Sequence, residues 1–131
     1  SSKKSNLVCI HDAARPFLTQ EVINNSINGC ENSDGAITAV PSRDTIKIGY
    51  NGNVKNTIER KSVWLAQTPQ AFCKSKLNIA AKNGEKNKLF VTDESMLMEE
   101  MGYRVKLVDG DEDNFKITTK KDWLRAEKLI C

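Results

Sequence analysis

The chain has 131 residues, of which 39% are hydrophobic, and this is typical of one globular domain with a modest core. Its 20 Lys and Arg and 17 Asp and Glu leave a net charge of +3, spread along the chain, which argues against a dedicated nucleic-acid-binding protein. No stretch approaches the roughly 18 apolar residues that cross a bilayer, and the polar start SSKKSN lacks the apolar core of a signal peptide, so we also expect no membrane contact.

The four cysteines are far apart in the sequence and form no CxxC pair. Neither a zinc site nor a disulfide framework is therefore indicated, and a reducing compartment is expected. The four are Cys9, Cys30, Cys73 and Cys131.

The first predicted element is a buried strand over 7–10, and it ends at polar residues. In open α/β sheets ligands bind just beyond the carboxyl ends of strands, so Asp12 and Arg15 are candidates for chemistry. Pro16 suits a turn that leads into a helix. The alternative is an ordinary ion pair at a strand end. His11, the single histidine, is interpreted as a structural residue and not as a general base.

The next elements predict a βαβ unit followed by a hairpin. Thr19 is a candidate N-cap for a helix whose apolar face carries Ile23, Ile27 and Cys30, and 36–40 is a short apolar strand. Two alternating stretches around an Asn51-Gly52 turn then predict a β-hairpin. A hairpin this polar buries little by itself, so we expect it to project and to pack on another surface, such as a second copy of the chain.

The second half continues with strands and helices. A strand over 63–66 is expected to reach a turn at Thr68-Pro69, and Ser75 is a candidate cap for a helix that ends at 82–84. Thr92 is a candidate cap for the next helix. Short strands are expected at 104–110 and 114–119. Thr119 and Asp122 are expected to start a last helix with four inward-facing residues, namely Trp123, Ala126, Leu129 and Ile130.

This alternation predicts an α/β fold with a mainly parallel, doubly wound (Rossmann-like) sheet, helices on both faces and a projecting β-hairpin arm at about 42–61. We expect residues 1–131 to form a single domain. The seven glycines include no phosphate-binding loop of the GxGxxG or GxxxxGK type.

Six strings, in order along almost the whole chain, resemble the later part of the 2-C-methyl-D-erythritol 4-phosphate cytidylyltransferases. They are HDAARP at 11–16, SRDTIK at 42–47, ER at 59–60, WLAQTPQAF at 64–72, TDES at 92–95 and VKLVDGDEDNFKITT at 105–119. The ribitol 5-phosphate cytidylyltransferases carry similar elements and are the alternative within this class. A non-catalytic module for ligand binding or dimerisation is the alternative outside it.

The resemblance implies a nucleotidyltransferase that transfers CMP from CTP to 2-C-methyl-D-erythritol 4-phosphate and releases pyrophosphate, in isoprenoid biosynthesis. It also implies Mg²⁺ bound mainly through the CTP phosphates, a homodimer formed through the hairpin arm, and a location in the bacterial cytoplasm or the plastid stroma. Two anions must meet in this reaction, so catalysis depends on positioning and cations, and a covalent nucleophile is not required.

The resemblance also implies roles for seven residues. Asp12 and Arg15 match the pair that lines the methylerythritol pocket, with Asp12 accepting from hydroxyls or standing near magnesium. Lys116 matches a lysine that neutralises phosphate charge. Thr45 and Arg60 match hairpin residues that reach the partner's substrate.

Thr68 and Thr92 match hydroxyl donors of the same pocket. The threonines also have simpler interpretations: Thr92 as a helix cap, Thr68 as a turn residue, and Thr45 as a β-branched strand residue.

One part of the family pattern has no counterpart here. The first third of these enzymes carries a glycine-rich loop with an arginine and a lysine that bind the triphosphate. We expect the chain to be a portion of a longer protein; a separate chain that supplies the loop and an inactive remnant are the alternatives. Because loss of one such donor typically costs about a hundredfold or more in rate, the chain alone is expected to show little or no transfer.

Overall fold

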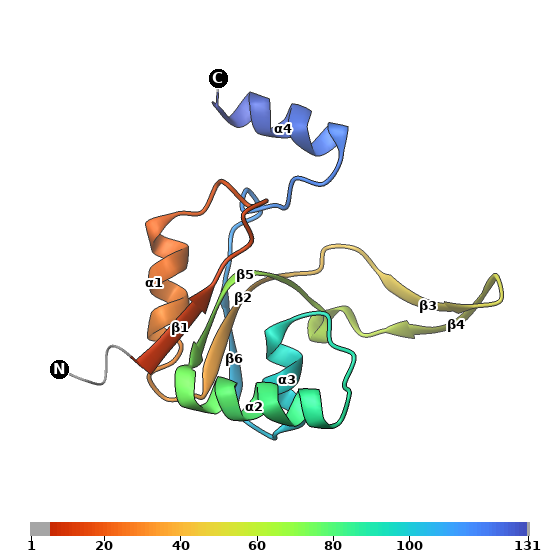
Figure 1. Cartoon of the computed structure of the whole chain (residues 1–131). Helices are drawn as coiled ribbons and strands as arrows, with labels where there is room; N and C mark the ends of the chain where they lie inside the picture. The colour runs from red at the N-terminus through yellow and green to blue at the C-terminus, as the bar shows by residue number, and fades with distance from the viewer. Residues whose placement is uncertain (1–5, 131) are drawn as a thin grey trace.

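A computed structural model describes residues 6–130 of the chain (Figure 1). Most of the polar start SSKKSN, and Cys131, lie outside these residues. The elements are β1 (Leu7–Ile10), α1 (Gln20–Asn28), β2 (Gly35–Pro41), β3 (Ile46–Tyr50), β4 (Asn53–Ile58), the short 3-10 helix η2 (Arg60–Ser62), β5 (Trp64–Cys73), α2 (Lys74–Lys86), α3 (Glu94–Glu100), β6 (Val105–Asp109) and α4 (Lys120–Ile130).

The main sheet has four strands in the order β1-β5-β2-β6, and the α/β class is confirmed. Strands β1, β2 and β6 run in the same direction, as the expected mainly parallel sheet requires. However, β5 lies between β1 and β2 and is antiparallel to both, so among the described strands only β2 and β6 form a parallel pair. The sheet is therefore mixed, because the chain returns from the hairpin in the opposite direction.

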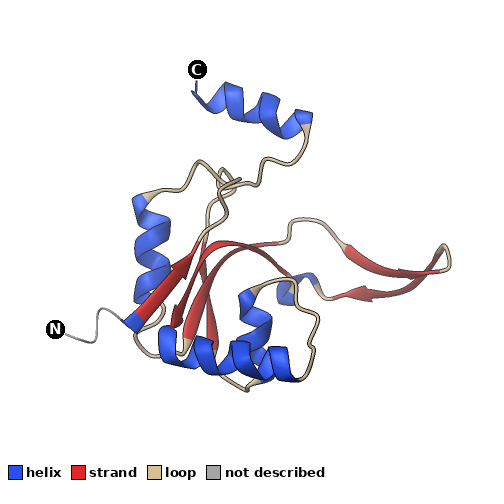
Figure 2. Cartoon of the chain, in the orientation of Figure 1, coloured by secondary structure: helices blue, strands red, loops and turns tan. Residues whose placement is uncertain are grey.

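Helices cover both faces of this sheet, as expected (Figure 2). Helix α1 packs on one face, and its predicted N-cap is confirmed because the Thr19 side chain accepts from the Val22 N–H at 3.3 Å. Helices α2 and α3 lie on the other face, over a core of Phe72, Ala80 and Met98.

Helix α2 does not end at Gly84 as predicted, and it begins without a cap from Ser75. Its N-cap is Cys73, which makes no capping hydrogen bond through its side chain. Gly84 is a buried helical residue, and a Cβ there would lie 2.4 Å from Cδ2 of Leu97. The glycine thus permits the close approach of α2 to α3 and does not act as a terminator.

The predicted turn at Thr68-Pro69 is wrong, because β5 continues through it to Cys73. The pairing of β5 with β2 is irregular here: Ile37 pairs with Gln70 and Ala39 with Ala66, so three residues of β5 oppose Thr38 alone. Proline lacks an N–H and is tolerated in sheets at such bulges. The Pro69 carbonyl accepts instead from the Thr38 hydroxyl at 2.7 Å.

The hairpin of β3 and β4 is confirmed, with Asn51 and Gly52 both at positive φ in its turn. It forms a separate two-stranded sheet that projects from the body (Figure 1).

The C-terminal region differs more from expectation. No strand forms at 114–119; the Ile117 N–H donates instead to the Ala14 carbonyl at 2.8 Å. Helix α4 extends away from the sheet (Figure 1), and of its apolar residues only Ala126 is buried. The expectation that Trp123, Leu129 and Ile130 face inward is wrong, since their exposed fractions are 57%, 44% and 75%. None of the described helices has the length and apolar character needed to cross a bilayer.

Candidate active site

The candidate site lies at the carboxyl ends of β1, β2 and β6, where binding sites of α/β sheets are generally found. Because these three strands run in the same direction, the loops that follow them meet at one edge of the sheet. The bulge of β5 lies at the same edge and contributes Gln67, Thr68 and Pro69. Bulges commonly redirect side chains next to functional sites.

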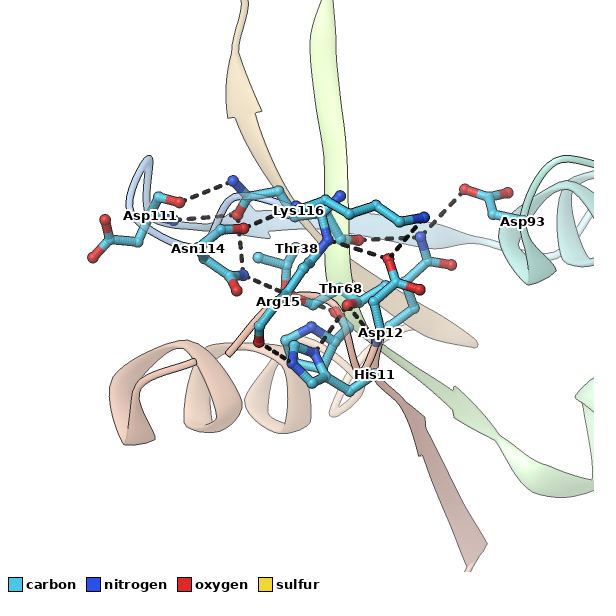
Figure 3. Close-up of polar contacts among 12 residues, drawn as sticks. His11, Asp12, Arg15, Thr38, Thr68, Asp93, Asp111, Asn114 and Lys116 are labelled. Atoms are coloured by element: carbon cyan, nitrogen blue, oxygen red, sulfur yellow. Dashed lines mark hydrogen bonds and ion pairs between the residues drawn. The ribbon is translucent and has the colours of Figure 1, made fainter. Parts of the chain in front are cut away.

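Asp12, Arg15 and Lys116 come together at this edge (Figure 3). Oδ2 of Asp12 lies 3.2 Å from Nε of Arg15 and 3.7 Å from Nζ of Lys116. The Arg15 side chain is 13% exposed, whereas those of Asp12 and Lys116 are 37% and 49% exposed. One carboxylate is therefore flanked by two cations, and the Lys116 ammonium is open to a ligand.

Thr68 connects the bulge to the loop after β1. Its Oγ1 accepts from the Asp12 N–H at 2.9 Å and lies 2.9 Å from Nδ1 of His11. The other ring nitrogen of His11, Nε2, donates to the Arg15 carbonyl at 2.9 Å. Both ring nitrogens are thus occupied, which agrees with the structural interpretation of His11 (Figure 3).

A buried polar network supports the three charged residues, and the sequence analysis missed it. Asn114 is 0% exposed; its Nδ2 donates to the Thr68 carbonyl at 2.7 Å and to Oε1 of Gln67 at 3.3 Å. The Asn114 carbonyl accepts from Nη1 of Arg15 at 2.8 Å. Nε2 of Gln67 in turn donates to the Asp111 carbonyl at 2.8 Å. Polar glutamines inside the otherwise apolar strand 64–73 were the available signal.

A cavity of about 410 Å³ opens beside these residues. Asp12, Arg15, Thr68, Thr92 and Lys116 all line it, so five of the seven predicted site residues share one cavity. Gln70, Asp93 and Glu94 also line it.

Thr92 is not the cap of α3. Asp93 is the N-cap, because its Oδ1 accepts from the Met96 N–H at 3.0 Å while its Oδ2 accepts from Nε2 of Gln70 at 3.2 Å. The Thr92 N–H and hydroxyl instead point at the Met96 thioether, at 3.2 and 3.1 Å. A thioether is a weak acceptor, so both donors of Thr92 can be redirected to a ligand.

Thr45 and Arg60 do not line this cavity in their own chain. Both are exposed at the base of the hairpin arm. Nη1 of Arg60 donates to the Arg43 carbonyl at 3.2 Å, which leaves donors of its guanidinium available to another group. Their role toward a partner's substrate stays a prediction.

Comparison with known proteins identifies the family. The family model described as 2-C-methyl-D-erythritol 4-phosphate cytidylyltransferase matches residues 1–131. The chain belongs to the 2-C-methyl-D-erythritol 4-phosphate cytidylyltransferase family.

Curated members of this family align along nearly the whole chain. The enzyme of Bacillus licheniformis is 42% identical over 127 residues, which are 97% of this chain and 55% of that protein. The enzyme of Geobacter metallireducens is 38% identical over 125 residues, 95% of this chain and 54% of that protein. The chain thus spans about half the length of the curated relatives it matches.

Solved structures of the family share the fold. The 4-diphosphocytidyl-2C-methyl-D-erythritol synthase of Anaerococcus prevotii is 36% identical and superposes with a TM-score of 0.88, covering 95% of this chain and 58% of that one. The enzyme of Thermus thermophilus is 31% identical with a TM-score of 0.86, and the match covers 62% of its chain.

Binding of a metal ion such as Mg²⁺ at this site would depend on its carboxylates. Within residues 6–130 no cluster of three or more His, Cys, Asp or Glu side chains is arranged for a metal ion. Asp12, Asp93 and Glu94 are the carboxylates that line the cavity; Oδ2 of Asp12 already faces two cations, and both oxygens of Asp93 accept hydrogen bonds. This donor set fits an ion that a nucleotide brings with it and does not fit an all-protein metal site.

Proposed function

We propose that this chain supplies the acceptor pocket of a methylerythritol phosphate cytidylyltransferase. The reaction transfers CMP from CTP to 2-C-methyl-D-erythritol 4-phosphate and releases pyrophosphate. The observation that carries the proposal is the convergence of Asp12, Arg15 and Lys116 on one cavity, in a chain that belongs to this family.

The cavity suits a small polyol phosphate. Its carboxylates and amides can accept hydrogen bonds from hydroxyl groups, and Lys116 and Arg15 can neutralise a phosphate. A volume of about 410 Å³ is also within the usual range for small-molecule sites.

In the proposed step an oxygen of the acceptor phosphate attacks the α-phosphorus of CTP, and the bond from that phosphorus to the bridging oxygen of pyrophosphate breaks. Lys116 and Arg15 reduce the repulsion between the two anions, and Asp12 fixes the acceptor through its hydroxyls. Magnesium, bound mainly through the CTP phosphates with Asp12 nearby, would stabilise charge on the leaving pyrophosphate. No side chain has to form a covalent intermediate.

The proposal includes a homodimer in which the hairpin arm of one copy reaches the other. The arm carries exposed apolar side chains at its tip, Tyr50 and Val54, with 71% and 65% exposure. Thr45 and Arg60 at its base would contribute to the site of the partner. Deletion of the arm tests this contribution. We also propose action in the bacterial cytoplasm or the plastid stroma.

A chimera tests this function. Replacing the matching segment of the Bacillus licheniformis enzyme by this chain restores the remainder of the family's length. The chimera is expected to release pyrophosphate when CTP and methylerythritol phosphate are both present, and to prefer that acceptor to ribitol 5-phosphate. The isolated chain is expected to release little or none.

Two results would overturn the proposal. A chimera that folds, as judged by circular dichroism and cooperative unfolding, but shows no acceptor-dependent release while the parent enzyme is active would contradict the enzymatic function. If that chimera still binds methylerythritol phosphate, the chain is a ligand-binding module. Preference for ribitol 5-phosphate would assign the other acceptor.

A further inference from the structure

The sequence contains three Asn-Gly pairs, and the fold places them in different environments. A glycine after an asparagine leaves its backbone nitrogen without steric protection, because glycine has no side chain. Such a nitrogen can attack the side-chain amide of the asparagine when the local backbone is free to move. The pairs are Asn28-Gly29, Asn51-Gly52 and Asn83-Gly84.

Asn51 and Gly52 form the turn of the hairpin arm, and both residues are exposed. Their φ angles are 50° and 79°, and a Cβ on Gly52 would meet no atom within 4 Å. The hydrogen bond that closes a two-residue turn joins the residues that flank it, here Tyr50 and Asn53. Within residues 6–130 the Gly52 N–H accordingly has no backbone acceptor. Its nitrogen can therefore react without the loss of a hydrogen bond.

The other two glycine nitrogens are held by helices. The Gly29 N–H donates to the Asn25 carbonyl at 2.9 Å, and Gly29 is buried against Ala36 although Asn28 is exposed. Gly84 is buried inside α2, where each N–H donates to the carbonyl four residues before it. Attack by either nitrogen requires the loss of a helical hydrogen bond and the movement of a buried backbone.

The turn of the arm also opens more easily than the two helices. The arm is a separate two-stranded sheet, and a hairpin of two strands is at best marginally stable by itself. Both of its strands are exposed along nearly their whole length. Segments with few buried contacts open at low cost in free energy, whereas packed helices open only in larger unfolding events. The turn therefore reaches a reactive geometry more often than the helices do.

We propose that Asn51 is a site of selective, spontaneous deamidation in the folded protein. The Gly52 nitrogen loses its proton to solvent base and attacks Cγ of Asn51. The new N–Cγ bond forms, the bond from Cγ to Nδ2 breaks, and ammonia leaves with a proton from water. Water then opens the cyclic imide. Cleavage of its N–Cγ bond leaves aspartate, and cleavage of its bond to the backbone carbonyl carbon leaves isoaspartate.

The product changes the tip of the arm. A neutral amide becomes a carboxylate, and in isoaspartate the main chain is longer by one carbon, which does not fit a two-residue turn. Asn51 lines a cavity of about 500 Å³ together with the apolar side chains of Tyr50 and Val54. A charge at this cavity opposes contact with an apolar surface. The modification does not depend on the proposed function, whereas a weaker homodimer as its consequence does.

Incubation of the 131-residue chain in mildly alkaline buffer, followed by peptide mass spectrometry at intervals, tests the modification. Loss of ammonia at Asn51, with separate aspartate and isoaspartate peptides, is expected to be at least about tenfold faster than at Asn28 or Asn83. Asn53 is the matched control at the same tip: it is exposed, but the bulky Val54 follows it, and it should stay intact. In guanidinium chloride the three Asn-Gly pairs should react at similar rates, because their structural difference is removed.

Two results would overturn the proposal. If Asn28 or Asn83 reacts as fast as Asn51 in the folded chain, the fold does not select the site. If Asn51 stays intact in the folded chain but reacts in guanidinium chloride, the turn protects it.

Sedimentation of the Asn51→Asp variant measures the consequence for association. The variant is expected to form a weaker homodimer than the wild type, and Asn87→Asp, an exposed asparagine after α2, should leave the homodimer unchanged. A homodimer that Asn51→Asp leaves unchanged would contradict this consequence. A wild type that is monomeric at every concentration would contradict the proposed homodimer, and the modification site would stand.

Discussion

Arg15 and Asn114 are 99 residues apart in the sequence, and Nη1 of the arginine donates to the carbonyl of the asparagine at 2.8 Å. The side chain of the same asparagine reaches Thr68 on β5. One buried residue therefore links the loop after β1, the bulge of β5 and the loop after β6. The charged residues of the site depend on this link for their positions.

Asn114→Ala should lower the free energy of unfolding by about 2–3 kcal/mol, because two hydrogen bonds and a buried side chain are lost. Urea unfolding followed by circular dichroism measures the change. Asn87→Ala, which removes an exposed asparagine on α2's C-cap, is the control and should cost less than about 0.5 kcal/mol. Equal stability of Asn114→Ala and the wild type would contradict the linking role.

Thr68→Val keeps the shape of the side chain but removes its hydroxyl. The Asp12 N–H and Nδ1 of His11 would then lose their partner, at a cost of about 1–3 kcal/mol in unfolding free energy. Thr68→Ser retains the hydroxyl and should unfold close to the wild type in the same urea titration. A serine variant as unstable as the valine variant would show that the methyl group matters more than the hydrogen bonds.

Asp34 predicts a pH dependence. Its carboxylate accepts from Lys76 and from the Arg104 N–H, and these contacts lower the pKa of Asp34 below 3.8 in the folded chain. A lowered folded-state pKa stabilises the protein above the unfolded pKa, and this contribution is lost as the pH falls through the folded pKa. The stability difference between wild type and Asp34→Asn should therefore be largest near pH 6 and shrink below 3.8 in urea titrations. A difference that is constant with pH would refute this.

The cysteines should differ in reactivity. Hydrogen bonds from Ser75 and the Lys76 N–H lower the pKa of the Cys73 thiol, whereas burial raises the pKa of Cys30 to about 11. Since the thiolate is the nucleophile, iodoacetamide at neutral pH should modify Cys73 before Cys30. Peptide mass spectrometry gives the order, and Ser75→Ala should slow modification of Cys73. Faster modification of Cys30 would contradict the assignment.

Local patterns in the sequence predicted the parts of the fold that depend on local chemistry. The Asn51-Gly52 turn and the Thr19 cap are examples, because each is determined by a few neighbouring residues. The position of β5 between β1 and β2 depends on pairing between distant segments, and no local pattern encodes it. Pro69 suggested a turn because proline is rarely tolerated inside a strand. It is tolerated inside β5 because it lies in the bulge opposite Thr38, and that bulge depends on pairing with a distant strand.

The charged members of the candidate site were predicted because their residue types suggest chemistry. Asp12, Arg15 and Lys116 do lie together, although their roles toward a substrate remain predictions. The buried amides of Gln67 and Asn114 were missed, because an amide shows its role only through the hydrogen bonds it makes across the fold. The sequence favours Thr92 as the cap of α3, but the cap is the adjacent Asp93. Local sequence does not resolve this difference of one residue.

The most direct test of the central claim is the affinity of the 131-residue chain for methylerythritol phosphate before and after removal of the Lys116 charge. Calorimetric titration should show binding to the wild type, and Lys116→Met should weaken it by about tenfold or more. Lys74→Met, an exposed lysine at the start of α2, should leave the affinity unchanged. Equal affinities of the wild type and Lys116→Met would contradict the claim that Asp12, Arg15 and Lys116 form the acceptor pocket.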